Sequence, residues 1–171
     1  MSTNDDVSDP RSEALLGPLR DLVRIAPAGF AIGLHVRFAS VRFMLQSYPR
    51  AWIDEYSARG YGIHDPTVAW GMANTGRIAW ADMAVTGDDA ARVMDLAARA
   101  GLVHGLTVAH VASASRSVAS FARSDRPFTG DEGARIEDLT GALHDATLDL
   151  ERLPAGFRPR LVAMGISATT A

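Results

Sequence analysis

The aromatic residues Tyr48, Trp52 and Tyr56 recur every four positions in the sequence. Side chains four residues apart lie on the same side of an α-helix, so a helix here presents one aromatic stripe. Tyr and Trp each carry a polar group that needs a partner when the ring is buried. One interpretation is a core face packed on a sheet. The other is a pocket that is apolar in bulk, with a few hydrogen-bonding groups directed into it.

Asp65 directly precedes Pro66, and this pair also has two interpretations. A carboxylate at the N-cap followed by Pro at the first helical position is a common helix start. An ionised carboxylate only accepts hydrogen bonds, so in a pocket it would bind an N–H group of a ligand. The local sequence leaves both interpretations open.

Motifs for metal binding and catalysis are absent from the sequence. The five His show no H-E-x-x-H or similar spacing, and there is no Cys, so no metal or cofactor site is expected. No G-x-S-x-G or glycine-rich phosphate motif occurs either. His64 adjoins Asp65, but adjacent side chains point apart in most backbones, which argues against an acid/base pair. These observations favour a binding protein over an enzyme.

Composition narrows the class of protein further. The 171 residues are 47% hydrophobic and 22% charged, as expected of one globular domain. A net charge of −3 offers no basic excess for binding DNA phosphates. No apolar run approaches the roughly 20 residues of a membrane span, and the polar, acidic residues 1–10 do not resemble a secretory signal. We expect a cytoplasmic protein without membrane association, with residues 1–10 disordered.

Hydrophobic periodicity predicts the elements that must position these residues. In the segment that starts at Phe30, apolar residues alternate strictly as far as Phe38, which predicts a strand, and a turn at Ala39 leads to the next one. At Thr129 a capping box with Glu132 predicts a helix start. The predicted helices are 11–26, 49–59, 66–74, 88–101 and 129–153, and the predicted strands are 30–38, 41–47, 77–81, 104–112 and 117–123.

This order of elements predicts an α+β fold, an α/β/α sandwich with a central antiparallel sheet of about five strands and helices on both faces. Such an architecture can hold a ligand between sheet and helices. The tail, residues 154–171, carries no predicted element.

The combination of aromatic and acidic residues resembles a known family. It is similar to the autoinducer-binding domain of LuxR-type quorum-sensing receptors, which bind N-acyl homoserine lactones. The resemblance covers about residues 11–150 and includes the segment 97–108 around Gly105; the domain it implies spans residues 11–153. The residues that carry it, with their separations, are Tyr48, Trp52, Tyr56, Asp65, Pro66 and Trp80.

By this resemblance, Trp52 would donate its indole N–H to the lactone carbonyl. Asp65 would accept the amide N–H of the ligand. Tyr48 and the hydroxyls of Thr67 and Ser120 would contact the acyl carbonyl, directly or through water. Each role suits the donors and acceptors that the side chain offers.

Tyr56 and Trp80 would wall the lactone and the start of the acyl chain. The small residues Gly33, Ala39 and Ala119 could leave room for a long chain. The length of the acyl group and its oxidation at the third carbon remain open.

The sequence departs from the family pattern in two places. Ala109-His110 and the segment "SASRS" stand where the family commonly has Pro and Gly residues, so the hairpin there is expected to differ. No segment after Pro154 predicts the family's C-terminal helix-turn-helix.

These observations favour a sensor that binds an acyl-homoserine lactone. In one version the chain is the sensory half of a LuxR-type transcription regulator. In the other, a short stand-alone protein sequesters the signal or inhibits a full-length regulator by pairing with it; the ending "LVAMGISATTA", unlike a linker, favours this version. A lactone-hydrolysing enzyme is a distant third. The resemblance implies a homodimer or such a heterodimer, and no direct DNA binding by this chain is expected.

Overall fold

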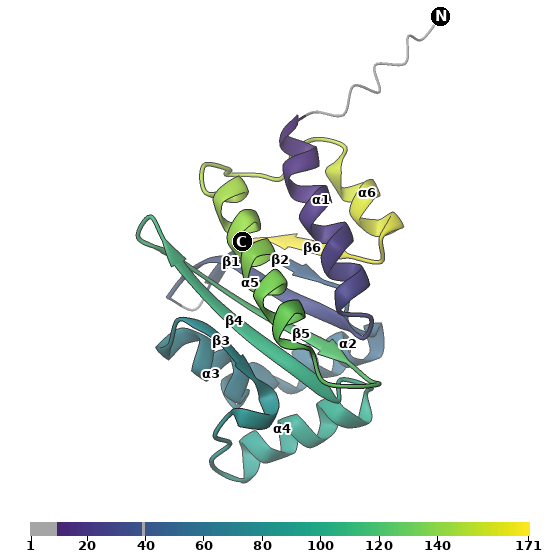
Figure 1. The fold of residues 1–171 in the computed structure, drawn as a ribbon, viewed down its shortest axis with the longest axis vertical. Helices are drawn as coiled ribbons and strands as arrows, with labels where there is room; N and C mark the ends of the chain where they lie inside the picture. The colour runs from purple at the N-terminus through teal and green to yellow at the C-terminus, as the bar shows by residue number, and fades with distance from the viewer. Residues whose placement is uncertain (1–9, 39) are drawn as a thin grey trace, which may run out of the picture.

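A six-stranded antiparallel sheet forms the middle layer of the protein, with helices on both faces (Figure 1). The computed structural model describes residues 10–38 and 40–171, so the predictions for residues 1–9 and for Ala39 lie outside the described residues. The strand order is β3-β4-β5-β1-β2-β6. The strands are β1 (Gly29–Arg37), β2 (Ser40–Gln46), β3 (Gly76–Ala79), β4 (His104–Ala112), β5 (Ser115–Arg123) and β6 (Ser167–Thr170).

Six α-helices and two short 3-10 turns complete the described chain, and the predicted α+β fold is confirmed. None of the helices in the described part is long and apolar enough to cross a membrane. The helices are α1 (Pro10–Ile25), α2 (Arg50–Arg59), α3 (Pro66–Ala73), α4 (Asp88–Arg99), α5 (Gly130–Thr147) and α6 (Phe157–Ala163), and the 3-10 turns are η1 (Tyr61–Ile63) and η2 (Trp80–Asp82).

The predicted count of about five strands is one short, because the tail is structured. Residues predicted to carry no element form α6 and β6, and β6 pairs with β2 at the edge of the sheet. Phe157 and Leu161 of α6 are buried in the main core, which holds this short helix in place. The strand reads Ser-Ala-Thr-Thr, so it lacks the apolar alternation that would have predicted it.

The sheet has two chemically different faces. Helices α1 and α5 cover one of them, here called the α1/α5 face, whose core includes the fully buried Leu19, Phe30 and Phe121. Helices α2, α3 and α4 lie on the other side, here called the pocket face (Figure 1). Because side chains alternate along each strand, successive residues within β4, and likewise within β5, lie on opposite faces of the sheet.

A β-bulge in β1 changes which face its last residues occupy. The strict alternation predicted one face for Leu34, Val36 and Phe38. Instead, pairing with β5 shifts register between Gly33 and Val36, and His35 adopts a left-handed φ of 58°. His35 therefore joins Leu34 on the α1/α5 side, whereas Val36 and Phe38 border the pocket face.

The β4–β5 hairpin turns through two residues that are not glycine. Ala112 pairs with Ser115, and the intervening Ser113 and Ala114 have φ values of 51° and 56°. Two positive φ values in a two-residue loop are typical of a type I′ turn, which usually selects Asn-Gly. The segment "SASRS" therefore makes a tight hairpin with residues poorly suited to it.

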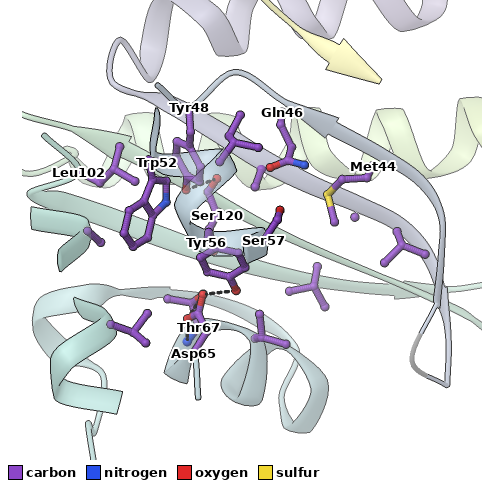
Figure 2. A pocket seen from close by; sticks show the side chains of 18 of the residues that line it. Met44, Gln46, Tyr48, Trp52, Tyr56, Ser57, Asp65, Thr67, Leu102 and Ser120 are labelled. Carbon is purple, nitrogen blue, oxygen red and sulfur yellow. Dashed lines mark hydrogen bonds between the residues drawn. The ribbon is translucent and has the colours of Figure 1, made fainter. Parts of the chain in front are cut away.

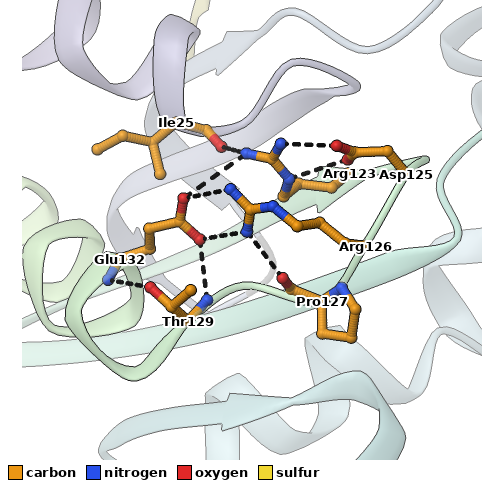
Figure 3. Close-up of polar contacts among 7 residues, drawn as sticks. All are labelled: Ile25, Arg123, Asp125, Arg126, Pro127, Thr129 and Glu132. Atoms are coloured by element: carbon orange, nitrogen blue, oxygen red, sulfur yellow. Dashed lines mark hydrogen bonds and ion pairs between the residues drawn. The ribbon is translucent and has the colours of Figure 1, made fainter.

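The predicted capping box begins α5. Thr129 Oγ1 accepts the Glu132 N–H (3.1 Å), and the Glu132 carboxylate accepts the Thr129 N–H (2.8 Å). Arg126 donates two hydrogen bonds of 2.8 Å to the same carboxylate, and together with the Thr129 N–H it lowers the pKa of Glu132 to about 2 (Figure 3). Arg123 donates to the Ile25 carbonyl (2.9 Å), joining the ends of β5 and α1.

Candidate ligand-binding site

A cavity of about 410 Å³ lies between the pocket face of the sheet and helices α2, α3 and α4. This volume is in the range of small-molecule sites, about 300–1,000 Å³. Most of the lining is apolar and includes Val36, Val41, Met44, Val68, Met72, Val93, Met94, Leu102 and Val118. The structure also brings all seven predicted site residues to this cavity: Tyr48, Trp52, Tyr56, Asp65, Thr67, Trp80 and Ser120.

Helix α2 supplies the aromatic wall. The rings of Trp52 and Tyr56 lie 5.7 Å apart, edge to face, as their helical spacing predicted. Gly60 ends the helix in the left-handed conformation (φ 65°), and the chain turns directly into Tyr61, whose ring lies 5.9 Å from that of Trp52. Pro49 is the N-cap residue rather than the first helical residue, one position from the prediction.

Asp65 is both a helix cap and a pocket residue. Its Oδ1 accepts hydrogen bonds from the Thr67 backbone N–H (2.8 Å) and hydroxyl (2.7 Å), so the predicted N-cap with Pro66 at the first position is confirmed. Its Oδ2 accepts the Tyr56 hydroxyl (2.8 Å; Figure 2). Burial, together with the charge of Asp65, raises the pKa of Tyr56, so its hydroxyl stays protonated. These contacts fix the carboxylate at the cavity wall.

Tyr48 and Trp52 differ in how their polar groups are used. The Tyr48 hydroxyl donates to the backbone carbonyl of Ser120 (3.0 Å), and burial raises its pKa. The Trp52 indole is 5% exposed, and no group in the described residues accepts a hydrogen bond from its N–H. In Figure 2 the ring nitrogen lies on the side that faces Ser120. The indole nitrogen is not shut off from solvent, so water or a ligand oxygen in the cavity can accept its hydrogen bond.

A chain of hydrogen bonds crosses the sheet beneath the cavity. The Trp80 indole donates to Thr107 Oγ1 (3.0 Å), which lies 2.8 Å from Ser120 Oγ. Because Thr107 accepts from Trp80, its own hydroxyl hydrogen is available for Ser120 Oγ. Of the two directions that this contact allows, donation by Thr107 leaves the Ser120 hydrogen for a ligand. Thr107 was not predicted as a site residue, although its alternation with Gly105 places it on the pocket face.

Gly105 accounts for the position of Trp80. A Cβ atom at residue 105 would lie only 1.8 Å from the Trp80 ring. No side chain at residue 105 could therefore coexist with this position of the indole, because contacts under 3.0 Å force a displacement of the ring.

The small residues considered for a long acyl chain are divided between the two faces. Gly33 borders the cavity. Ala119 is buried in the core of the α1/α5 face, so it makes no room for a ligand. Two further polar residues, Gln46 and Ser57, line the cavity and were not predicted.

The α1/α5 face holds a cluster of His that sequence spacing did not reveal. His35 Nε2 lies 2.8 Å from Thr147 Oγ1, and its Nδ1 lies 2.8 Å from Ser115 Oγ. Thr147 donates its hydroxyl to a backbone carbonyl, so it accepts the Nε2–H of His35. Ser117 Oγ accepts the backbone N–H of His35 (3.1 Å) and contacts His144 Nδ1 (2.8 Å). Both ring nitrogens and the backbone N–H of His35 thus have partners.

This cluster also contains the one metal-like grouping found in the described chain. His110, His144 and Asp145 place potential ligand atoms within 4.8 Å of one another. However, His144 already uses Nδ1 on Ser117 and Nε2 on the Ala112 carbonyl (3.2 Å). Only His110 Nε2, which is buried without a partner, and the exposed Asp145 carboxylate remain unengaged, fewer than the three protein ligands typical of a catalytic zinc site.

The chain is similar to known proteins in sequence family and in fold. A family model described as the autoinducer binding domain matches residues 30–147. No curated protein matches the sequence.

The fold is similar to those of solved LuxR-type structures. SdiA in complex with octanoyl-rac-glycerol superposes with a TM-score of 0.61 at 17% identity, covering 90% of this chain and 72% of SdiA. The N-acylhomoserine lactone dependent LuxR family transcription factor CepR2 from Burkholderia cenocepacia gives 0.54 at 20% identity, covering 89% and 99%. Residues 1–171 of Escherichia coli SdiA in solution give 0.60 at 17%, covering 83% and 89%.

Proposed function

We propose that this chain, which belongs to the family of autoinducer-binding domains, binds an N-acyl homoserine lactone in the cavity of its pocket face. The observation that carries the proposal is the match between the ligand and the polar groups at the cavity that can make a further hydrogen bond. The cavity offers the Trp52 N–H and the Ser120 hydroxyl as donors, and the Asp65 carboxylate as an acceptor. An acyl-homoserine lactone has two carbonyls and one amide N–H.

Each polar group of the ligand then has one partner. Trp52 donates to the lactone carbonyl, and Asp65 accepts the amide N–H. Ser120 donates to the acyl carbonyl, whereas Tyr48 and Thr67 line the cavity with their hydroxyls bonded to the Ser120 carbonyl and to Asp65. Tyr56 and Trp80 flank the lactone ring without donating to it, because the Tyr56 hydroxyl donates to Asp65 and the Trp80 N–H donates to Thr107. Asp65 is held in place before the ligand arrives, which reduces the ordering cost of binding.

The apolar part of the cavity suits the acyl chain. Val36, Val41, Met72 and Val118 line the region toward the β1–β2 hairpin, away from Trp52 and Asp65. Phe38 also borders this region and is fully exposed, so the cavity opens toward solvent there. Burial of an acyl chain along these side chains supplies affinity in proportion to the apolar area covered.

Binding rather than hydrolysis is supported by the absence of an activated nucleophile at the cavity. No His of the described chain borders the cavity. The candidate nucleophile is the Ser120 hydroxyl, which pairs with Thr107 rather than with a base. We therefore infer a signal sensor rather than a lactonase.

Two settings for this sensor follow from the family. As part of a LuxR-type transcription regulator in the cytoplasm, it would pass ligand occupancy to a DNA-binding domain through a homodimer. As a stand-alone domain, it would sequester the signal or pair with a full-length regulator. Neither setting requires this chain itself to bind DNA.

Thermal unfolding in the presence of candidate ligands tests the proposal. A matching lactone at a hundred times its Kd stabilises the native state by about 2.7 kcal/mol, which raises the melting temperature by several degrees. The panel should contain short, long and 3-oxo acyl-homoserine lactones, with octanoyl glycerol as the alternative acyl ligand. A shift with octanoyl glycerol alone, or ring opening of the lactones by pure protein, would contradict the proposal.

A further inference from the structure

Gln46 and Ser57 are the two polar residues of the cavity that the assigned roles leave unused. Gln46 lies on β2 and Ser57 on α2, and both line the cavity. Figure 2 shows both side chains directed into the space beside Met44. Within the described residues, neither side chain makes a hydrogen bond.

Ser57 is exposed where it borders the cavity, so water satisfies its hydroxyl when the cavity is empty. A Ser within a helix commonly bonds the carbonyl four residues earlier, but Ser57 does not. A Gln amide offers two donors and two acceptor sites. Gln46 is only partly buried, so water reaches its amide when the cavity is empty. A bound ligand would displace that water.

The position of Gln46 tells which part of a ligand would meet it. Gln46 and Tyr48 lie on the same face of the β2 segment, two residues or about 7 Å apart. From the Tyr48 end, which borders the proposed amide site, the face continues through Gln46 to Met44. Gln46 therefore faces the beginning of an acyl chain, whereas Val36 and Phe38 face its end.

A plain hydrocarbon chain at this position would cover the Gln46 amide without giving it a partner. Leaving a buried amide unpaired costs affinity, whereas an oxygen on the chain would take the place of the displaced water. The same oxygen could contact Ser57 from the α2 side.

We propose that Gln46, assisted by Ser57, recognises an oxo or hydroxyl oxygen on the first few carbons of the acyl group. This inference rests on the proposed function, because it assumes that the lactone occupies the cavity with its amide at Asp65. It assigns the ligand to the oxygen-substituted class of acyl-homoserine lactones.

Calorimetry of the full chain with three ligands of equal length tests this assignment: N-decanoyl, N-(3-oxodecanoyl) and N-(3-hydroxydecanoyl) homoserine lactone. The wild type is expected to bind the oxygenated ligands about tenfold more tightly than the plain one. Gln46→Leu should bring all three affinities within about twofold of one another. Ser57→Ala should reduce the preference by a smaller factor.

Gln46→Glu separates a hydrogen-bond effect from a packing effect. A carboxylate keeps the shape of the side chain but only accepts, so binding of the 3-oxo ligand should weaken while the 3-hydroxy ligand is retained. Met44→Leu is the matched control, since it alters the adjacent lining without a polar group and should change all three affinities alike. Thermal melts establish that each variant is folded.

The outcomes distinguish the two proposals. Equal affinity of the wild type for all three ligands, or a preference that survives Gln46→Leu, would overturn the role of Gln46 and leave the proposed function intact. If none of the three ligands binds, the proposed function is overturned, and this inference with it.

Discussion

The two faces of the sheet each hold a polar cluster, and the clusters differ in whether their polar groups are mostly bonded to the protein or open to a cavity. On the α1/α5 face, both ring nitrogens of His35 and the Ser117 hydroxyl have protein partners, and among the described residues only His110 Nε2 is a buried polar side-chain atom without one. On the pocket face, the Trp52 N–H and the Gln46 amide have none in the described chain. Completed buried networks stabilise and fix a fold, whereas unpaired groups at a cavity are available to a ligand. The same sheet thus separates stability from recognition.

His35→Ala should have the largest effect and should act on stability. The change leaves a cavity and removes the partners of Thr147 and Ser115, so we expect a loss of about 2–4 kcal/mol in the free energy of unfolding. Urea denaturation measures it, with exposed His64→Ala as the matched control, expected within about 0.5 kcal/mol of wild type. A wild-type unfolding curve for His35→Ala would remove the distinction between the faces.

Asp65→Asn should act mainly on ligand affinity. Asn caps helices about as well as Asp, so the unfolding free energy should change little. Loss of the charged acceptor for the ligand amide should weaken binding by about one to two decades, the equivalent of 1.5–3 kcal/mol. Calorimetry on the folded variant measures this. Wild-type affinity would reduce Asp65 to a helix cap.

Acidification should weaken the α1/α5 face. Burial, with His144 and Arg42 nearby, lowers the pKa of His35 from 6.5 to about 4. Between these two pKa values, His35 is protonated in the unfolded chain and neutral in the native chain. The stabilisation present above pH 6.5 is therefore lost as the pH falls toward 4. We expect about 1–2 kcal/mol to be lost between pH 7 and 5. His35→Gln should flatten this dependence, and an unchanged slope in that variant would exclude His35 as its source.

Thr107→Val should have the smallest of these effects, and it should lower both the free energy of unfolding and the ligand affinity. It removes the acceptor of the Trp80 N–H and the group that orients Ser120. We expect a loss of about 1 kcal/mol in stability and a threefold to tenfold loss in affinity. Thr107→Ser keeps the hydroxyl and should restore affinity. If Ser and Val at residue 107 bind alike, the hydrogen-bond chain does not orient Ser120.

The sequence predicts the pocket face better than the α1/α5 face, because the patterns that form the pocket face lie within short segments of the chain. The spacing of Trp52 and Tyr56 is local and helical, so it predicted their part of the aromatic wall, whereas Tyr48 precedes α2 and does not lie on the helix as predicted. Asp65-Pro66 predicted a helix cap. The bulge at His35 has no such pattern, since its left-handed residue is not Gly.

Long-range contacts account for the remaining differences. His35, Ser117 and His144 meet only because β1, β5 and α5 pack together, which no spacing within one segment encodes. Strand β6 was not predicted for a similar reason: its pairing with β2, and not a pattern within its own residues, makes it a strand.

Calorimetric titration of wild type and Trp52→Phe with the lactone that gives the largest thermal shift tests the central claim most directly. Phe keeps most of the packing in the aromatic wall and removes only the unpaired N–H directed at the cavity. The account predicts a folded variant of unchanged or slightly greater stability that binds the lactone at least tenfold more weakly, in line with the 1–3 kcal/mol cost of an unpaired carbonyl. Wild-type affinity in Trp52→Phe would contradict the claim that the pocket face keeps its polar groups open for this ligand.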